Sequence, residues 1–176
     1  MKVKSLTFAY DETEDRILLG CSNDSQSRRL LLTRRITRRL LSAFANVLKT
    51  SSRAVKQAPA DLRREVIVLE HLASLSAEQP AAGGTVGAGD PAALADLGQA
   101  LVWKVDVAVE PVLFTLSFHS TTAPLAALSL NRADFHKVLA ALDHCALVAE
   151  WDVHAEAGWL GEAENVAASM ERRNAS

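Results

Sequence analysis

Apolar and polar residues alternate along two segments in the second half of the chain, 101–110 and 112–119. In the first segment, Val105 and Val107 flank Asp106. Successive side chains of a β-strand point to opposite faces, so this alternation predicts strands with one apolar and one polar face. Such strands are typical of an antiparallel sheet that packs on one side and meets water on the other.

The pattern predicts three short strands followed by a helix, and it does so twice. In the first half the strands cover 2–10, 16–22 and 28–33, and the helix covers 34–49. In the second half the strands cover 101–110, 112–119 and 125–130, and the helix covers 132–147. The helices are predicted from apolar residues that recur every three or four positions.

The two helical segments also align with each other. Residues 32–48 match 130–146 without a gap, 98 positions apart (130 − 32), and four aligned pairs are identical. Thr33 and Asn131 fall where a strand ends and a helix begins, so each is predicted to cap its helix through a side-chain oxygen. The alignment predicts two diverged copies of one unit.

A three-stranded meander with one helix has two unpaired edges and a small core, so one copy alone is a poor fold. We therefore expect an α+β protein in which two tandem strand-strand-strand-helix repeats form a pseudo-twofold antiparallel sheet core, with the helices packed on it. The meanders could join edge to edge or face to face, and the pattern does not distinguish these alternatives.

The segments between and after the repeats differ in character. Residues 59–79 have helical spacing after Pro59, although the run 66–69 also suits a strand. Residues 80–90 hold four glycines and no periodicity, which is typical of a flexible linker. We divide one globular domain into a first repeat (1–50), a connecting helix (51–79), a Gly/Ala-rich linker (80–98), a second repeat (99–153) and a polar tail or helix (154–176).

Composition narrows the function classes. Nineteen basic and twenty-one acidic residues give a net charge of −2, so the whole chain has no long-range attraction for nucleic acid or anionic membranes. The N-terminal segment lacks the continuous apolar run of a secretory signal, and no stretch has the length of a membrane span. Cys21 and Cys145 lie far apart in apolar surroundings and are expected to be reduced. These features favour a cytoplasmic protein with no membrane contact.

Three groups of residues are candidate sites for chemistry. The glycine run has no phosphate-binding fingerprint. His136 and His144 are eight positions apart on one predicted helix, and with Cys145 and His154 they lack metal-ligand spacing. His119 precedes Ser120, and adjacent residues of an extended chain point apart, which disfavours nucleophile activation. We expect no metal, no cofactor and no catalytic residue, and we favour a non-enzyme.

The candidate binding residues are six arginines within the segment RRLLLTRRITRR: Arg28, Arg29, Arg34, Arg35, Arg38 and Arg39. Four of them start the predicted helix, where the helix dipole and mutual repulsion disfavour cations. Internal carboxylates from the acidic turn 11–15 or from Glu65 and Glu70 could offset this. An acidic surface of another protein, or self-association, is the functional alternative that we favour. A nucleic-acid backbone ranks below it, because the chain is acidic overall and aromatic residues are missing from the cluster.

Overall fold

The computed structural model describes residues 1–77, 85–94, 97–153, 158–163, 165–166 and 172. Within them, five strands form a mixed sheet in the order β4-β1-β2-β3-β5, and three form an antiparallel sheet in the order β6-β7-β8. The first sheet consists of β1 (Ser5–Asp11), β2 (Arg16–Ser22), β3 (Ser27–Leu32), β4 (Thr85–Ala88) and β5 (Gln99–Leu101). The second consists of β6 (Lys104–Val109), β7 (Phe114–His119) and β8 (Pro124–Leu130). The expected α+β class is confirmed.

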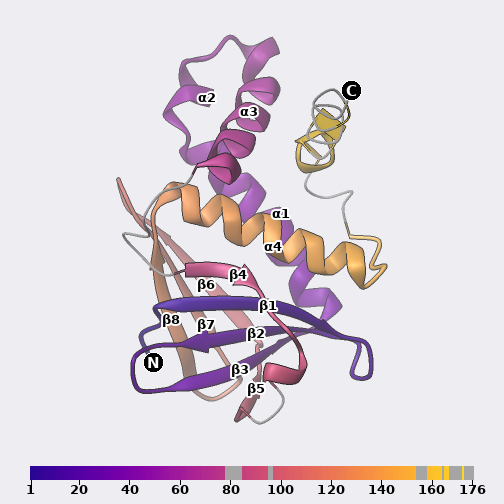
Figure 1. Cartoon of the computed structure of the whole chain (residues 1–176). Coiled ribbons are helices and arrows are strands. Elements are labelled where there is room, and N and C mark those ends of the chain that lie inside the picture. The colour runs from indigo at the N-terminus through magenta and orange to yellow at the C-terminus, as the bar shows by residue number, and fades with distance from the viewer. Residues whose placement is uncertain (78–84, 95–96, 154–157, 164, 167–171, 173–176) are drawn as a thin grey trace.

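The helices lie on one side of the strands. They are α1 (Arg34–Ser51), α2 (Arg53–Gln57), α3 (Arg63–Ser76) and α4 (Arg132–Val148). Figure 1 shows α1 and α4 crossing each other next to the sheets, with α2 and α3 farther from the strands. The Thr33 hydroxyl accepts from the Ile36 N–H (3.3 Å), and the Asn131 side-chain oxygen Oδ1 accepts from the Asp134 N–H (2.8 Å). Both predicted caps are confirmed.

The order of three antiparallel strands and then a helix occurs in both halves, as β1-β2-β3-α1 and as β6-β7-β8-α4. Apart from the strand at 101–110, the structure therefore confirms the predicted elements of both units within a few residues at their ends. That the two units are diverged repeats related by a pseudo-twofold axis stays a prediction.

The chain passes from the first sheet to the second between β5 and β6. The Val102 N–H donates to the Leu31 carbonyl of the first sheet (3.0 Å), and the next residue, Trp103, donates to the His119 carbonyl of the second (2.8 Å). The single strand predicted at 101–110 is therefore wrong. Its first residue belongs to β5, which pairs with β3, and β6 pairs with β7.

The amino-terminal residues make a second connection between the sheets. The Val3 N–H donates to the Ala127 carbonyl of β8 (2.8 Å), and the Ala127 N–H donates to the Met1 carbonyl (2.9 Å). The Lys4 N–H then donates to the Ser22 carbonyl of β2 (2.8 Å). The two sheets are thus joined by backbone hydrogen bonds at two separate places.

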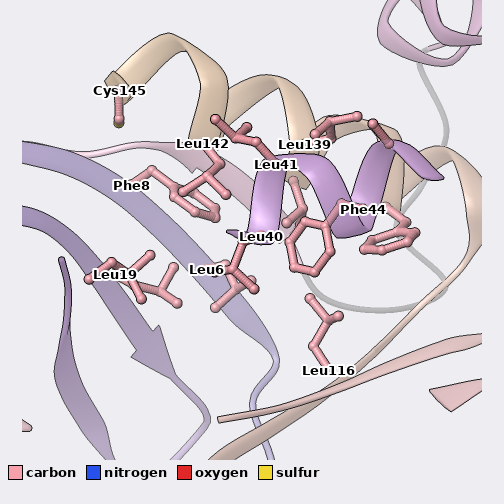
Figure 2. Close-up of a cluster of buried hydrophobic side chains, with 14 of the residues drawn as sticks. Leu6, Phe8, Leu19, Leu40, Leu41, Phe44, Leu116, Leu139, Leu142 and Cys145 are labelled. Carbon is pink, nitrogen blue, oxygen red and sulfur yellow. The ribbon is translucent and has the colours of Figure 1, made fainter. Parts of the chain in front are cut away.

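Both sheets and both long helices share one apolar core. Figure 2 shows side chains of the two sheets meeting side chains of α1 and α4. The first sheet supplies Leu6, Phe8 and Leu19, the second supplies Leu116, α1 supplies Leu40, Leu41 and Phe44, and α4 supplies Leu139, Leu142 and Cys145. The predicted packing of both helices on the apolar faces is confirmed.

The expected linker contains regular structure. Residues 85–88 form β4, which pairs in parallel with β1, and the 3₁₀ turn Ala92–Leu94 (η2) brings Leu94 against Ala9 and Leu18 on the outer face of the first sheet. The segment expected to be a flexible linker thus contains a strand and a 3₁₀ turn in this part. Residues 80–84 and 95–96 lie outside the described residues.

The connecting and terminal segments differ in detail from expectation. The connecting segment is α2, a 3₁₀ turn at Ala60–Leu62 (η1) after Pro59, and α3; the strand alternative at 66–69 is wrong, because these residues belong to α3. In the tail, expected to be polar, three apolar residues are buried in the core: Trp159, Leu160 and Ala163. The rest of the predicted tail is only partly described. Within the described residues, no helix has both the length and the apolar character of a membrane span.

Candidate functional site

The structure divides the six arginines into two groups. Arg28 and Arg29 lie on β3, where Arg28 Nη1 is 3.5 Å from the Leu125 carbonyl oxygen and Arg29 Nη2 donates to Gln99 Oε1 (2.7 Å). At the rise of a strand, the four residues from Arg29 to the cap of α1 span roughly 13 Å. The predicted cluster is therefore a pair at one end of β3 and a separate group at the start of α1.

The remaining four arginines, Arg34, Arg35, Arg38 and Arg39, are exposed at the start of α1, and we call them the arginine face. They are held there by the opposite, buried side of the helix: Ile36, Thr37, Leu40, Leu41, Phe44, Ala45 and Leu48. The first turn contains no acidic residue, so its own sequence does not compensate the cations at the positive end of the helix dipole.

The acidic turn does approach the arginine face. The Asp15 carboxylate accepts hydrogen bonds from Trp151 Nε1 (2.8 Å) and from the Tyr10 hydroxyl (2.9 Å). These bonds lower the pKa of Asp15, and the charges of Arg16 and Arg34 lower it further. Asp15 is one of the internal carboxylates that could offset the arginine charges. It attracts Arg34 electrostatically, but its hydrogen bonds are with aromatic side chains.

Arg35 lies over an exposed aromatic ring. Its guanidinium carbon is 5.7 Å from the centroid of Trp103, the residue directly before β6. The Trp103 side chain is 55% exposed, whereas Trp151 and Trp159 are 3% and 6% exposed. This contact places the start of α1 beside the start of β6, and an arginine on an aromatic face is a common element of recognition surfaces.

The far end of α1 lies beside the far end of β6. A surface cleft of about 660 Å³ separates them; it is lined on the helix side by Val47, Thr50, Ser51, Arg53 and Lys56, and on the strand side by Val109, Glu110 and Pro111. Since Arg35 meets Trp103 at one end, and Val47 and Val109 line the cleft at the other, α1 runs beside β6. We call this cleft, together with the adjoining edge of β6, the α1–β6 groove.

The edge of β6 that does not face β7 is open. β6 is the outer strand of its sheet, and no strand of the described residues pairs with its other side. The Glu110 N–H donates to the Leu113 carbonyl (2.9 Å), so the backbone groups of Glu110 and of every second residue before it point toward β7. The N–H and C=O groups of Val105, Val107 and Val109 therefore point away from β7.

A buried polar network lies between α3 and α4. The Glu70 carboxylate accepts from His136 Nε2 (3.3 Å), from Ser52 Oγ (2.6 Å) and from Arg132 Nε. An ionised carboxylate only accepts, so His136 carries its proton on Nε2, and its Nδ1 accepts from His71 Nδ1, 3.0 Å away. Sequence reasoning did not find this network, because it joins two groups of residues, 52–71 and 132–136, that are more than 60 positions apart.

The network shifts the pKa values of its members. Burial alone would raise the pKa of Glu70, but hydrogen bonds from His136, Ser52 and Arg132 lower it to about 2. Burial lowers the pKa of His71 to about 4 and also lowers that of His136. At neutral pH the network therefore holds one carboxylate, one guanidinium and two neutral imidazoles.

Arg132 ties this network to the end of α1. Its Nη1 donates to Ser51 Oγ (2.8 Å) and its Nη2 to the Leu48 carbonyl (2.5 Å). His136 is fully buried and His71 is 3% exposed, so neither imidazole is open to a substrate. The arrangement fixes three helices together and is best explained as structural.

The other residues weighed for chemistry are placed separately. Ser120 Oγ accepts from the N–H groups of Thr122 and Ala123, as in a polar turn, and His119 Nε2 lies 3.2 Å from Asp106 Oδ2. His144 is exposed while His136 is buried, and His154 lies outside the described residues. Within the described part of the chain, no group of three or more His, Cys, Asp or Glu residues is placed to hold a metal ion.

Comparison with known proteins gives no further lead to the site. No family model, no curated protein and no solved structure matches this chain. Function must therefore be inferred from the arginine face and the α1–β6 groove.

Proposed function

We propose that this protein is a non-catalytic module that docks to an acidic surface of another protein through the arginine face of α1. The observation that carries the proposal is that these cations are exposed on the first two turns of a helix without an acidic residue in its first turn. Because the dipole and like-charge repulsion disfavour this arrangement, a bound anion would stabilise it.

The chemistry of the side chains supports a protein partner. Guanidinium groups bind carboxylates through paired hydrogen bonds, which lysine cannot do. The nearby exposed Trp103 adds an apolar contact of the kind that anchors protein interfaces. A nucleic-acid backbone is the alternative, and it is disfavoured by the net charge of −2.

Two pairwise substitutions test the proposal, each removing two charges. In one variant Arg35 and Arg39 are replaced by Gln, and in the control Arg28 and Arg29 are replaced by Gln. Soluble polyglutamate serves as the acidic probe and duplex DNA as the alternative probe. We expect the α1 variant to weaken polyglutamate binding and the β3 control to leave it nearly unchanged.

The same titrations separate the alternatives. For duplex DNA, log K falls with log salt at a slope of about −0.9 per neutralised phosphate, and the α1 variant would flatten that slope by up to about two such steps. DNA binding that is tighter than polyglutamate binding at equal salt would favour the nucleic-acid alternative. Equal losses in both variants would show a diffuse charge effect and would contradict docking through the arginine face.

A further inference from the structure

We propose that the α1–β6 groove binds an extended segment of the partner protein, with acidic residues at alternate positions, which adds to the open edge of β6 as another strand. The proposal rests on the docking function above and assigns the partner a backbone conformation and a binding position. Addition of a strand to an exposed sheet edge is a general mode of peptide recognition, in which main-chain hydrogen bonds supply affinity and side-chain pockets supply specificity.

The backbone of β6 is suited to this role. Val105, Val107 and Val109 direct their N–H and C=O groups outward, and no strand of the described residues meets them. Edge strands are usually protected by inward charges, proline or a bulge, because an open edge attracts other chains. Within β6 the charged residues Lys104 and Asp106 bind each other (2.8 Å), and they are exposed on the opposite face from the half-buried Val105 and Val107.

Charge complementarity fixes the chemistry of the segment. Arg35, Arg39, Ala43 and Val47 are each four positions apart and lie on one side of α1. This side of the groove is therefore cationic at its start and apolar at its end. At the far end, the cleft is lined by Arg53 and Lys56 against a single carboxylate, Glu110. Acidic side chains of a bound strand would meet these cations.

The face of β6 toward α1 also carries exposed apolar surface at its two ends. Trp103 is 55% exposed at the start of the strand, and Val109 is 51% exposed at its end. Val109 shares this face with Val105 and Val107, and the Arg35 contact places Trp103 toward α1. Because successive side chains of a bound strand point to opposite faces, only alternate residues of the segment meet the cations of α1 and need to be acidic.

A second copy of this chain fits the edge less well. Symmetric pairing of two β6 strands is antiparallel, so the arginine face of one copy would lie beside Arg53 and Lys56 of the other, and like charges held close at an interface oppose association. We therefore assign the groove to an acidic partner, and self-pairing is an outcome that the test below can reveal.

The test uses a short peptide of alternating glutamate and valine, with a peptide of alternating lysine and valine as its control. Binding is measured by the fluorescence of the exposed Trp103 and by calorimetric titration. The main variant is Val109→Pro, which removes a backbone N–H that points away from β7. Proline is tolerated at such a position of an edge strand. The matched control, Val109→Thr, keeps the N–H and the β-branched shape.

We expect the acidic peptide to bind the wild-type chain and the basic peptide not to bind. Val109→Pro should weaken the acidic peptide about tenfold, as expected for one lost backbone hydrogen bond, and Val109→Thr should bind it like the wild type. The same peptide N-methylated on alternate residues lacks the donors along one edge. It should bind weakly to the wild-type chain, which tests strand addition even if the proline variant does not fold.

The results that would contradict this proposal can be told apart from one another. If Arg35→Gln with Arg39→Gln weakens the acidic peptide while proline, threonine and N-methylation have no effect, the docking function stands and strand addition is wrong. If neither peptide binds the wild-type chain, strand addition is wrong and the polyglutamate titration judges the docking function separately. If sedimentation shows a dimer that Val109→Pro makes monomeric, the occupant is a second copy and the assignment to an acidic partner is wrong.

Discussion

The buried imidazole pair predicts a loss of stability when the pH falls from 7 to 5. His71 and His136 face each other through their Nδ1 atoms at 3.0 Å, and only one proton fits between them. Burial keeps both rings neutral in the folded protein, because it lowers the pKa of His71 to about 4 and also lowers that of His136. In the unfolded chain His71 titrates near its ordinary pKa of about 6.5.

The sign follows from proton linkage. Between about pH 6.5 and 4, the unfolded chain binds a proton at His71 that the folded chain does not bind, so the free energy of unfolding falls as the pH falls. The full slope is about 1.4 kcal/mol per pH unit for one proton, which amounts to about 2 kcal/mol between pH 7 and 5. Glu70, with its pKa lowered to about 2, contributes its own loss only below its ordinary pKa of 4.5.

The assay is urea denaturation at several pH values from 7 to 5, which stays above the range in which Glu70 titrates. His71→Phe should be less stable than the wild type at pH 7, because His136 Nδ1 loses its donor, but its stability should fall less on acidification. His144→Asn is the control, since His144 is an exposed histidine on α4. It should keep the wild-type slope.

One result would refute the reasoning. If His71→Phe and the wild-type chain lose the same free energy of unfolding between pH 7 and 5, then His71 is not held neutral in the fold. The pair would then titrate as ordinary exposed histidines do.

Three further predictions concern stability and reactivity. Thr33→Ala and Asn131→Ala should each lower the free energy of unfolding by about 1 kcal/mol in urea, because each removes a confirmed cap; no change at either position would contradict that value. Burial raises the pKa of Cys21 to about 12 and that of Cys145 to about 11, so a thiol reagent at pH 7 should modify neither until urea unfolds the chain, and rapid native labelling would contradict this. Arg132→Leu should lower the free energy of unfolding by roughly 2 kcal/mol, as measured by thermal or urea unfolding. This loss is smaller than for a fully buried ion pair, because the carboxylate partner of Arg132 keeps two other hydrogen-bond donors.

Local pattern was sufficient to predict most of the secondary structure. The strand at 16–22 and the starts of α1 and α4 were predicted to the residue, because alternation, helical spacing and capping are properties of neighbouring residues. β4 was missed because Thr85–Ala88 lies in a glycine-rich run without alternation, and its strand conformation comes from parallel pairing with β1.

The candidate site was predicted less well. The arginines were found from their density, but the sequence could not show that Arg28 and Arg29 lie apart from the other four. The groove was missed because it requires α1 to lie along β6, a contact between halves of the chain. The predicted strand at 101–110 did contain the outward valines, yet alternation alone does not tell an edge strand from a central one.

The two places where the chain joins both sheets have a consequence for how the protein reaches its native state. Leu31 and Val102 are 71 positions apart (102 − 31), and Val3 and Ala127 are 124 apart (127 − 3). The first contact requires residue 102 and the second requires residue 127 to have left the ribosome, so the edge of β3 and the segment before β1 stay unpaired until then. Closing such long loops slows folding, and the exposed edges are sites where a chaperone would bind during synthesis.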